Sequence, residues 1–341
     1  MTEVGRRRWT DPTWLAGFSR WATGQLDALG YRLTDAPSQD HVRPWSTVLR
    51  LPTDRGPVWA KAMRASTAHE ARLLPAMVGW GVRAVIPPLA VDARRGWLLL
   101  EDGGPTLRQT RPDGTGDRDL AAWERVLATY AELQRSVEMR NEELMRIGVP
   151  DGRPATLVPT MHALLADDRW WGLVGPEDRA ASDAARERLG TLGAEIAARA
   201  TDLDASGIAP TIQHDDLHGG NVFVGPAGIR FFDWGDSVVA HPFASMVTTL
   251  NSVAHRLETT PDDPRLDRLR DAYLEAWTDV LPRPALHEVL ALALVLGRIG
   301  KAAAWARALG GLEPAEMEAH ADAPALWLAD LAELVDAGGG R

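Results

Sequence analysis

This 341-residue chain contains no cysteine and almost no lysine. The absence of cysteine excludes a disulfide framework, a thiol nucleophile and a zinc–thiolate site. Lys61 and Lys301 are the two lysines among 37 basic residues, and arginine fills the other positions. The chain therefore keeps a compact ammonium group at two places and uses the guanidinium group everywhere else.

The chain also lacks long hydrophobic runs. The longest strongly apolar run, Val289–Gly297, is too short to cross a bilayer. The N-terminal residues contain no apolar core of signal-peptide length, so we expect a cytoplasmic protein with no membrane association. The net charge of −10 argues against non-specific binding to nucleic acid and is compatible with a cationic substrate. No feature of the sequence implies a protein partner.

The apolar pattern divides the chain into a β-rich part and a helical part. A length of 341 residues with a hydrophobic fraction of 45% fits one large or two moderate globular domains. Alternating apolar segments separated by turn residues dominate the first third. The strands expected there are Val42–Leu51, Val58–Met63, Val85–Val91 and Gly96–Leu100, and the helices expected there are Asp11–Gly30 and Ala68–Met77.

Helical periodicity dominates the remainder of the chain. The expected helices are Leu120–Glu138, Met161–Leu165, Ala180–Ala200, Pro242–Leu257, Asp267–Val280, Ala285–Leu309 and Ala325–Leu334. We therefore predict an α+β fold with a small β-rich N-terminal lobe, residues 1–103, and a large, mainly helical C-terminal lobe, residues 104–341. The glycines and proline of Glu101–Pro105 end a strand and mark the expected hinge between the lobes.

One stretch, Ile212–Pro242, holds most of the residues that suggest chemistry. Apolar runs flank the turn sequence Gly225–Gly228, which predicts a β-hairpin. Such a hairpin would bring Asp216 and Asn221 close to Asp233. Carboxylate and carboxamide oxygens are hard ligands suited to Mg²⁺, so we interpret this stretch as a phosphoryl-transfer loop.

The spacing of this stretch matches a known pattern. His214-x-Asp216-Leu-x-x-x-Asn221 has the spacing of the protein-kinase loop H-x-D-L-x-x-x-N, and Asp233-Trp-Gly stands where kinases have Asp-Phe-Gly. The wording HDDLHGGN followed by FFDWGD resembles the aminoglycoside phosphotransferases and the choline-kinase-like small-molecule kinases. Their usual form is H-G-D-L-H-x-x-N followed by I-D-W/F-x-D/E. The resemblance covers roughly Val42 to Pro242 and implies a protein-kinase-like fold.

The resemblance implies ATP and Mg²⁺ as cofactors and gives the residues of this stretch their roles. Asp216 would accept the proton of the acceptor hydroxyl or orient that hydroxyl. Asn221 and Asp233 would hold Mg²⁺ against the phosphates. Residues in supporting roles would be His214, His218 and Asp236. We expect His214 to be structural, and Asp236 either supports the metal loop or caps the following helix.

The resemblance also extends to the N-terminal half. Lys61 stands in the place of the strand lysine that binds the α- and β-phosphates, and Glu70 matches the glutamate that pairs with it. Adenine would meet backbone groups near the hinge, at Leu100, Glu101 and Gly103.

Two departures from the family pattern stand out. The glycine-rich loop of kinases is missing, and Ser46 and Thr47 are the expected substitutes for its phosphate contacts. The arginine that precedes the catalytic aspartate of protein kinases is replaced by Asp215, so a small-molecule kinase fits better than a protein kinase regulated by phosphorylation. We expect the side chain of Asp215 to be solvated and Lys301 to be a surface residue that extends its ammonium into water.

Three functions fit the sequence. The favoured one is an ATP-dependent O-phosphotransferase acting on a small hydroxylated molecule. That molecule would be an aminoglycoside or another cationic amino sugar, or else a metabolite such as an amino alcohol or a sugar. The second function is a nucleotide-binding pseudokinase. The third is a metal-dependent phosphohydrolase built on the His-Asp cluster of His214, Asp215 and His218.

No motif identifies the acceptor, because many acceptors share one fold and one phosphate site. Acidic residues of the helical part are candidates for binding a cationic acceptor, and tryptophans there are candidates for lining its pocket. The acidic candidates are Asp167, Asp168, Glu258, Asp262 and Asp263, and the tryptophans are Trp170, Trp171 and Trp305.

Overall fold

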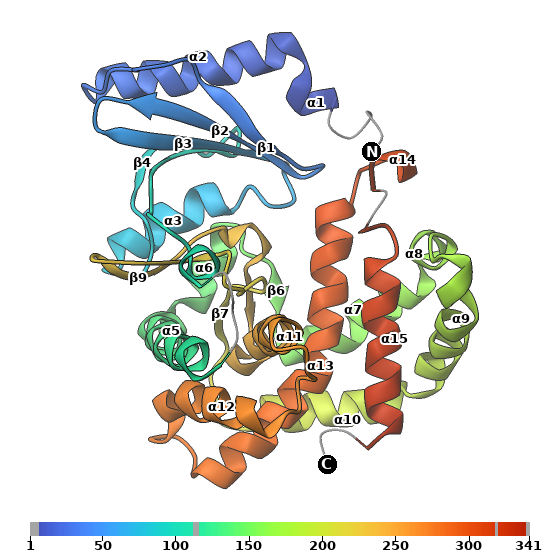
Figure 1. Ribbon diagram of the computed structural model, residues 1–341. Helices are drawn as coiled ribbons and strands as arrows, with labels where there is room; N and C mark the ends of the chain where they lie inside the picture. Colours follow the sequence, from blue (N-terminus) through green and yellow to red (C-terminus); the bar gives the residue numbers. More distant parts are fainter. Residues whose placement is uncertain (1–6, 112–115, 318–319, 339–341) are drawn as a thin grey trace.

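A five-stranded antiparallel sheet forms the N-terminal part of the protein (Figure 1). The computed structural model describes residues 7–111, 116–317 and 320–338, so the first six residues of the N-terminal segment, in which no signal peptide is expected, lie outside the described residues. The strands lie in the order β1-β2-β3-β5-β4. Their bounds are β1 Ser38–Val42, β2 Ser46–Thr53, β3 Gly56–Met63, β4 Pro88–Asp92 and β5 Trp97–Glu101.

Alternation along the central strand β3 gives the sheet its two faces. Val58, Ala60 and Ala62 are buried in a core shared with α2, Pro12–Ala28, which covers the outer face of the sheet (Figure 1). Lys61 has the opposite parity and faces α3, Glu70–Gly79, on the other side. The β3 pattern thus directs a lysine toward the rest of the molecule.

The structure corrects the predicted strand Val42–Leu51. The chain turns at residues 43–45 instead, and the backbone N–H of Arg43 donates to the carbonyl of Ser46 at 2.8 Å. Pro44 explains the turn, because proline has no N–H for a sheet ladder. The next two apolar segments pair as an antiparallel hairpin, β2 with β3, whose ladder extends to Pro52↔Pro57 and Thr53↔Gly56.

Helices make up most of the C-terminal part, which confirms the α+β prediction (Figure 1). The predicted helix Ala180–Ala200 is two helices that meet at Leu192. The bounds are α4 Leu107–Thr110, α5 Asp117–Val137, α6 Asn141–Arg146, α7 Pro154–Ala166, α8 Asp168–Gly172, α9 Pro176–Thr191, α10 Gly193–Asp204, α11 Met246–Arg256, α12 Asp267–Leu274, α13 Arg283–Leu309, α14 Pro314–Met317 and α15 Ala323–Asp336.

Short strands interrupt the helices and carry the stretch singled out in the sequence. A three-stranded sheet has the order β6-β10-β7, and β8 pairs with β9 as a hairpin. The bounds are β6 Asp151–Gly152, β7 Thr211–Gln213, β8 Val222–Gly225, β9 Gly228–Phe231 and β10 Val238–Ala240. The register Val222↔Phe231 confirms the predicted hairpin.

The long helix α13 contains the apolar run Val289–Gly297. By length and composition it would be long and apolar enough to cross a membrane, and 61% of its most apolar window is buried inside the protein. Among the described residues, α13 packs on α15, α7 and α10. A helix in the core of a soluble protein can have the same length and composition, and α13 packs as such a core helix does.

The inner side of the sheet shares one hydrophobic core with the helical part. Leu73, Leu74 and Met77 of α3 belong to the same cluster as Trp123 of α5 and Phe231 of β9. Residues 102–105, between β5 and the helical part, have no regular structure. The predicted lobe boundary at residue 103 falls in this connection.

Three buried histidines, His69, His214 and His241, should make the fold sensitive to acid. Burial lowers the pKa of His69 to about 4 and the pKa of His241 to about 3. Below the usual histidine pKa of about 6.5, the unfolded chain binds protons that the folded chain does not. The free energy of unfolding should therefore fall as the pH drops from 7 to 5, by up to about 1.4 kcal/mol per pH unit for each histidine.

Urea unfolding at pH 7, 6 and 5 measures this slope. His241→Asn should flatten it, because asparagine can still accept from the N–H of Phe243, as His241 Nδ1 does, and does not titrate. The exposed His255, changed to Asn, is the matched control and should leave the slope as it is. An unchanged slope in His241→Asn would contradict the assignment.

Candidate functional site

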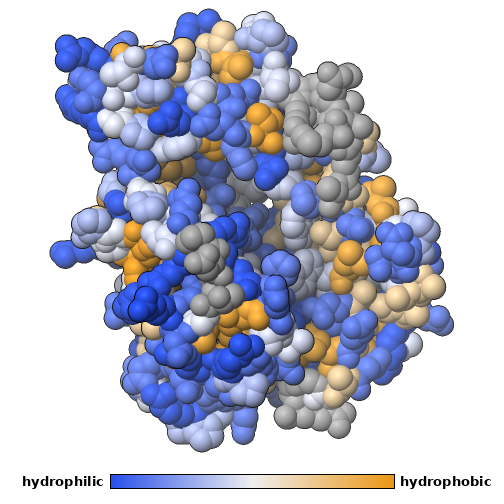
Figure 2. Space-filling model, in the orientation of Figure 1, coloured by the Kyte–Doolittle hydropathy of each residue, from blue (hydrophilic) through white to orange (hydrophobic). Residues whose placement is uncertain are grey.

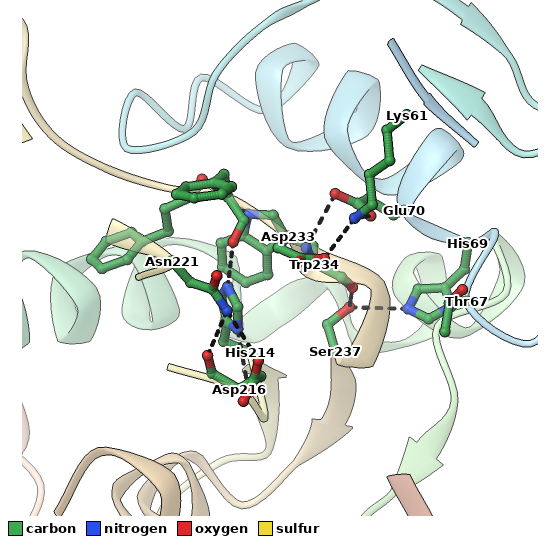
Figure 3. Close-up of polar contacts among 12 residues, drawn as sticks. Lys61, Thr67, His69, Glu70, His214, Asp216, Asn221, Asp233, Trp234 and Ser237 are labelled. Carbon is green, nitrogen blue, oxygen red and sulfur yellow. Dashed lines mark hydrogen bonds and ion pairs between the residues drawn. The ribbon is translucent and has the colours of Figure 1, made fainter. Parts of the chain in front are cut away.

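Lys61 connects the sheet to Glu70 of α3 and to Asp233, which follows β9 (Figure 3). Its Nζ atom forms an ion pair with Glu70 and lies 2.6 Å from Oδ1 of Asp233. Glu70 opens α3, and its Oε1 atom accepts from the N–H of Trp234 at 3.2 Å. Burial alone would lower the pKa of Lys61, but Asp233 and Glu70 outweigh burial and raise it above its usual value. The ammonium group is therefore held charged between two carboxylates.

Asp233 adopts an unusual backbone conformation. Its φ of 65° lies in the left-handed region, which side chains other than glycine rarely occupy. The residue precedes a short 3₁₀ helix, Trp234–Asp236, so the chain changes direction at this point. The side chain is half exposed and points toward Lys61 (Figure 3).

His214 fixes the loop of residues 214–221 from inside. Its Nδ1 atom accepts from the N–H of Asp216 at 3.3 Å, so Nε2 carries the proton and donates to the carbonyl of Phe232 at 2.8 Å. Its backbone N–H donates to the hydroxyl of Tyr130 at 2.8 Å. Burial lowers the pKa of His214, which keeps the ring neutral. Because both ring nitrogens are used, the geometry leaves His214 no proton to exchange and no free metal ligand.

The carboxylate of Asp216 lies next to Asn221 and His218. Asn221 Nδ2 donates to the backbone carbonyl of Asp216 at 2.9 Å and to its Oδ2 atom at 3.0 Å (Figure 3). His218 Nδ1 accepts from the N–H of Gly220, and its Nε2 atom lies 3.4 Å from the same Oδ2 atom. The Asn221 amide group is thereby turned to Asp216, and its oxygen is the atom that can bind a cation.

Asp215 and Lys301 occupy positions that the sequence did not predict. The solvated position predicted for Asp215 is wrong, because the residue is 2% exposed. The surface position predicted for Lys301 is also wrong, because Lys301 is 6% exposed and its Nζ atom donates to the backbone carbonyl of Asp215. These residues are far apart in the sequence, and the path of α13 brings them together.

Asp236 lies near Asp215 and Lys301. Burial and the negative charge of Asp216 raise the pKa of Asp236 to about 7, although Lys301 opposes the shift. The alternative that Asp236 caps the following helix is wrong, since His241 caps the 3₁₀ helix Pro242–Ser245 that comes next. Asp236 thus forms a carboxylate cluster with Asp215, Asp216 and Asp233.

The turn at residues 43–45, between β1 and β2, contacts the helical part. Thr47 is fully buried, and its hydroxyl donates to the carbonyl of His41 at 2.8 Å and accepts from Gln39 Nε2 at 2.9 Å. The Trp45 ring lies 5.8 Å from that of Trp305 in α13. The hydroxyl of Thr47 is therefore used inside the turn, and Trp305 contacts the sheet region. Nothing in the sequence indicated this contact.

The connection after β5 is held by close packing. Glu101 Oε1 accepts from the hydroxyl of Tyr31 at 2.7 Å, and Leu100 stands one residue before it at the end of β5. A Cβ atom on Gly103 would lie 2.1 Å from the ring of Phe223. Phe223 in turn stacks on Phe232, with ring centroids 4.1 Å apart. Glycine is required at residue 103 because the aromatic ring approaches the backbone directly.

The acidic candidates for acceptor binding are mostly paired with arginine. Asp167 pairs with Arg169, Asp168 with Arg186 and Asp263 with Arg265. Trp170 and Trp171 are buried in the main core, so the expectation that they line a pocket is wrong. The charge of each of these three aspartates is offset by a neighbouring arginine.

An internal cavity of about 50 Å³ lies next to β7. Gln213, His241 and Arg307 line it together with mostly apolar residues. Gln213 Oε1 and His241 Nε2 are buried with no hydrogen-bond partner. The volume suits a few water molecules. Asp216 does not line this cavity, although Gln213, which donates to Asp215, and Arg307, which donates to the carbonyl of Asp236, do.

The described residues contain no group of three His, Asp or Glu side chains arranged to hold a metal ion. The His-Asp hydrolase alternative needs such a group, and its His214 has no free ring nitrogen. Asn221 and Asp233, by contrast, carry side-chain oxygens at the same end of the β8–β9 hairpin. The molecular surface is hollowed between the sheet region and the helical part, and hydrophilic residues border much of the hollow (Figure 2).

Comparison with known proteins places this geometry in a family. The model of a phosphotransferase enzyme family matches residues 23–287. No curated protein sequence matches the chain.

Solved structures show the same fold. A choline kinase from Streptococcus pneumoniae matches with a TM-score of 0.60 and 11% identity, over 93% of this chain and 99% of that one. A macrolide 2'-phosphotransferase from Brachybacterium faecium matches with a TM-score of 0.54 and 16% identity, over 92% and 98%. An amicoumacin kinase in complex with AMP-PNP and Ca²⁺ matches with a TM-score of 0.55 and 13% identity, over 95% of each chain. The predicted protein-kinase-like fold is confirmed.

Gly103→Ala should destabilise the protein, because the added methyl group overlaps the Phe223 ring. We expect the free energy of unfolding to fall by about 1–3 kcal/mol, the usual cost of overpacking. Urea denaturation measures this change. Gly225→Ala is the control, since a Cβ atom there meets nothing within 4 Å. Equal stability of the two variants would contradict the packing argument.

Proposed function

The chain belongs to the phosphotransferase enzyme family, whose members act on hydroxyl groups of small molecules, and we propose that it transfers the γ-phosphoryl group of ATP to a hydroxyl of a small cationic molecule. The observation that carries this proposal is the convergence of two groups of residues. Lys61 and Glu70 come from the sheet side, and Asp216, Asn221 and Asp233 come from the helical side. Phosphoryl transfer needs little more than positioned groups and charge neutralisation.

Asp216 is the proposed catalytic residue. A carboxylate at this position would accept the proton of the acceptor hydroxyl or orient that hydroxyl toward the phosphate. Asn221 and His218 contact its Oδ2 atom, which limits the rotation of the carboxylate. The fixed carboxylate supports this role.

Asn221 and Asp233 are the proposed ligands of Mg²⁺. The ion accepts oxygen ligands and is usually bound by one or two carboxylates together with waters and substrate phosphates. The residues present fit that requirement, because Asn221 directs its amide group to Asp216 and keeps its oxygen available. Bound Mg²⁺ would supply charge neutralisation at the phosphates.

Lys61 would bind the α- and β-phosphates, and Glu70 would hold Lys61. The backbone at Leu100, Glu101 and Gly103 is proposed to contact adenine. The stacked rings of Phe223 and Phe232, which pack against Gly103, would form one wall of that site. Phosphate contacts from the turn before β2 would come from backbone N–H groups near Ser46, since the hydroxyl of Thr47 is already used.

The acceptor is proposed to be a cation such as an aminoglycoside or an amino alcohol. The net charge of −10 and the carboxylate cluster around Asp216 support a positively charged substrate. The similar structures include kinases of choline, a macrolide and amicoumacin by name, which leaves the class open among hydroxylated small molecules. A screen of ATP consumption over aminoglycosides, macrolides, amino sugars and amino alcohols tests the proposal.

Asp216→Asn should lower kcat by about 10²–10⁴, because asparagine cannot accept the hydroxyl proton. Affinity for ATP should change little, since Asp216 is not proposed to contact the nucleotide. Steady-state kinetics with the best acceptor of the screen and ATP binding by calorimetry measure the two quantities. Asp168→Asn, a change at an exposed surface pair, is the control. Normal turnover in Asp216→Asn would rule out the assigned role.

Removal of divalent cations should abolish turnover, and added Mg²⁺ should restore it. Asp233→Asn should require a higher Mg²⁺ concentration for half-maximal activity, because a neutral amide binds the ion more weakly than a carboxylate. Titration of Mg²⁺ after treatment with EDTA measures this requirement. Full activity of the wild-type protein in excess EDTA would refute the metal assignment.

A further inference from the structure

The second lysine of the chain reaches the loop that carries Asp216. Lys301 lies on α13, and its Nζ atom donates to the backbone carbonyl of Asp215. The same Nζ atom lies 3.8 Å from Oδ1 of Asp215. A buried ammonium group is costly unless it is paired. The backbone carbonyl and the carboxylate of Asp215 are the partners of the Lys301 ammonium.

The peptide that links Asp215 to Asp216 is held at both ends. Its carbonyl accepts from Lys301 and, at 3.1 Å, from the hydroxyl of Thr248. Its N–H, which belongs to Asp216, donates to Nδ1 of His214 at 3.3 Å. Contacts on both sides fix the plane of this peptide, and the peptide plane sets the direction in which the Asp216 side chain leaves the backbone.

Asp215 itself occupies a position that favours glycine. Its φ is 62°, and the family pattern that the loop resembles has glycine before the aspartate. Here a buried carboxylate stands instead, and Gln213 Nε2 donates to its Oδ1 atom at 3.0 Å. The positive charges near this carboxylate are Lys301 and Arg307, and the negative charges near it include Asp216 and Asp236.

We infer that Lys301 is a positioning residue that orients Asp216 through the carbonyl of Asp215. The inference rests on the proposed function, in which Asp216 receives the hydroxyl proton. Lys301 does not act on the substrate; it holds the backbone from which Asp216 projects. A charge-balancing role for Lys301, whose ammonium acts on the carboxylates of Asp215, Asp216 and Asp236, is the competing explanation.

Asp215→Gly removes the carboxylate that acts most strongly on Lys301, so that the hydrogen bond to the carbonyl can be tested with less charge to balance. Glycine removes the buried carboxylate, suits a φ of 62°, and leaves the carbonyl to which Lys301 donates. In this background, Lys301→Met removes the hydrogen bond without leaving an unpaired buried carboxylate at residue 215. The double variant should therefore fold, and a thermal melt by circular dichroism checks this.

The expected result is a change in kcat with little change in KM. Relative to Asp215→Gly, the double variant should lose about tenfold or more in kcat, since a small misplacement of a catalytic group has effects of this size. The KM for ATP should stay within about twofold, because the nucleotide contacts lie elsewhere. The acceptor is the one with the highest turnover among the compounds of the screen above.

Arg298→Met is the matched control on the same helix. Arg298 is 8% exposed and pairs with Asp330, away from the 214–221 loop. This variant should melt at a lower temperature and keep its kcat. A double variant that retains the kcat of Asp215→Gly would overturn the inference and leave Lys301 with charge balance alone.

Hydrogen–deuterium exchange of residues 214–221 gives a test that needs no turnover. Exchange should be faster in the double variant than in Asp215→Gly and unchanged in Arg298→Met. If the wild-type protein turns over no acceptor, the proposed function fails, while faster exchange still shows that Lys301 holds the loop. Equal exchange in the double variant and in Asp215→Gly would overturn the inference independently of activity.

Discussion

The burial of negative charge is the constraint on which the site depends. Carboxylates from α3, from the 214–221 loop and from the turn after β9 converge in one region. The carboxylates repel one another, and burial raises the pKa of Glu70, Asp215 and Asp236, so nearby cations are needed to offset both effects. Lys61 enters from β3 and Lys301 from α13, so the two parts of the molecule each contribute one ammonium group. The site exists only where both parts meet.

Strained backbone conformations also lie in this site. Three described residues other than glycine have a positive φ, and two of them, Asp215 and Asp233, lie in this site. Each of these aspartates contacts one of the two lysines, Asp233 with Lys61 and Asp215 with Lys301. Left-handed conformations of such residues persist where the surroundings hold them firmly. The ion pairs and the hydrogen bonds of His214 supply that support, so the strained residues stay in fixed positions.

Local patterns predicted the parts of the site that lie close together in the sequence. The hairpin followed from apolar runs around Gly225–Gly228, and its register places Asn221 and Asp233 at one end. The contact between Asp215 and Lys301 could not be predicted, because an apolar helix with one lysine has the same pattern whether that lysine faces water or a carboxylate. The turn at Pro44 was missed because the apolar run continues across it. The buried positions of Trp170 and Trp171 depend on packing between helices, which composition does not reveal.

The choice of lysine at these two places now has a physical reason. A guanidinium group is planar and presents its donors in a rigid fork, whereas an ammonium group is compact and can direct three donors as its surroundings require. Lys301 bonds a single backbone carbonyl in a buried position, where a fork would leave donors without partners. Lys61 contacts two carboxylates from different elements at once. Arg307 lies close by, yet it donates to the carbonyl of Asp236 at the edge of the cluster. A chain that uses arginine elsewhere therefore needs lysine where one positive charge must fit among converging oxygens.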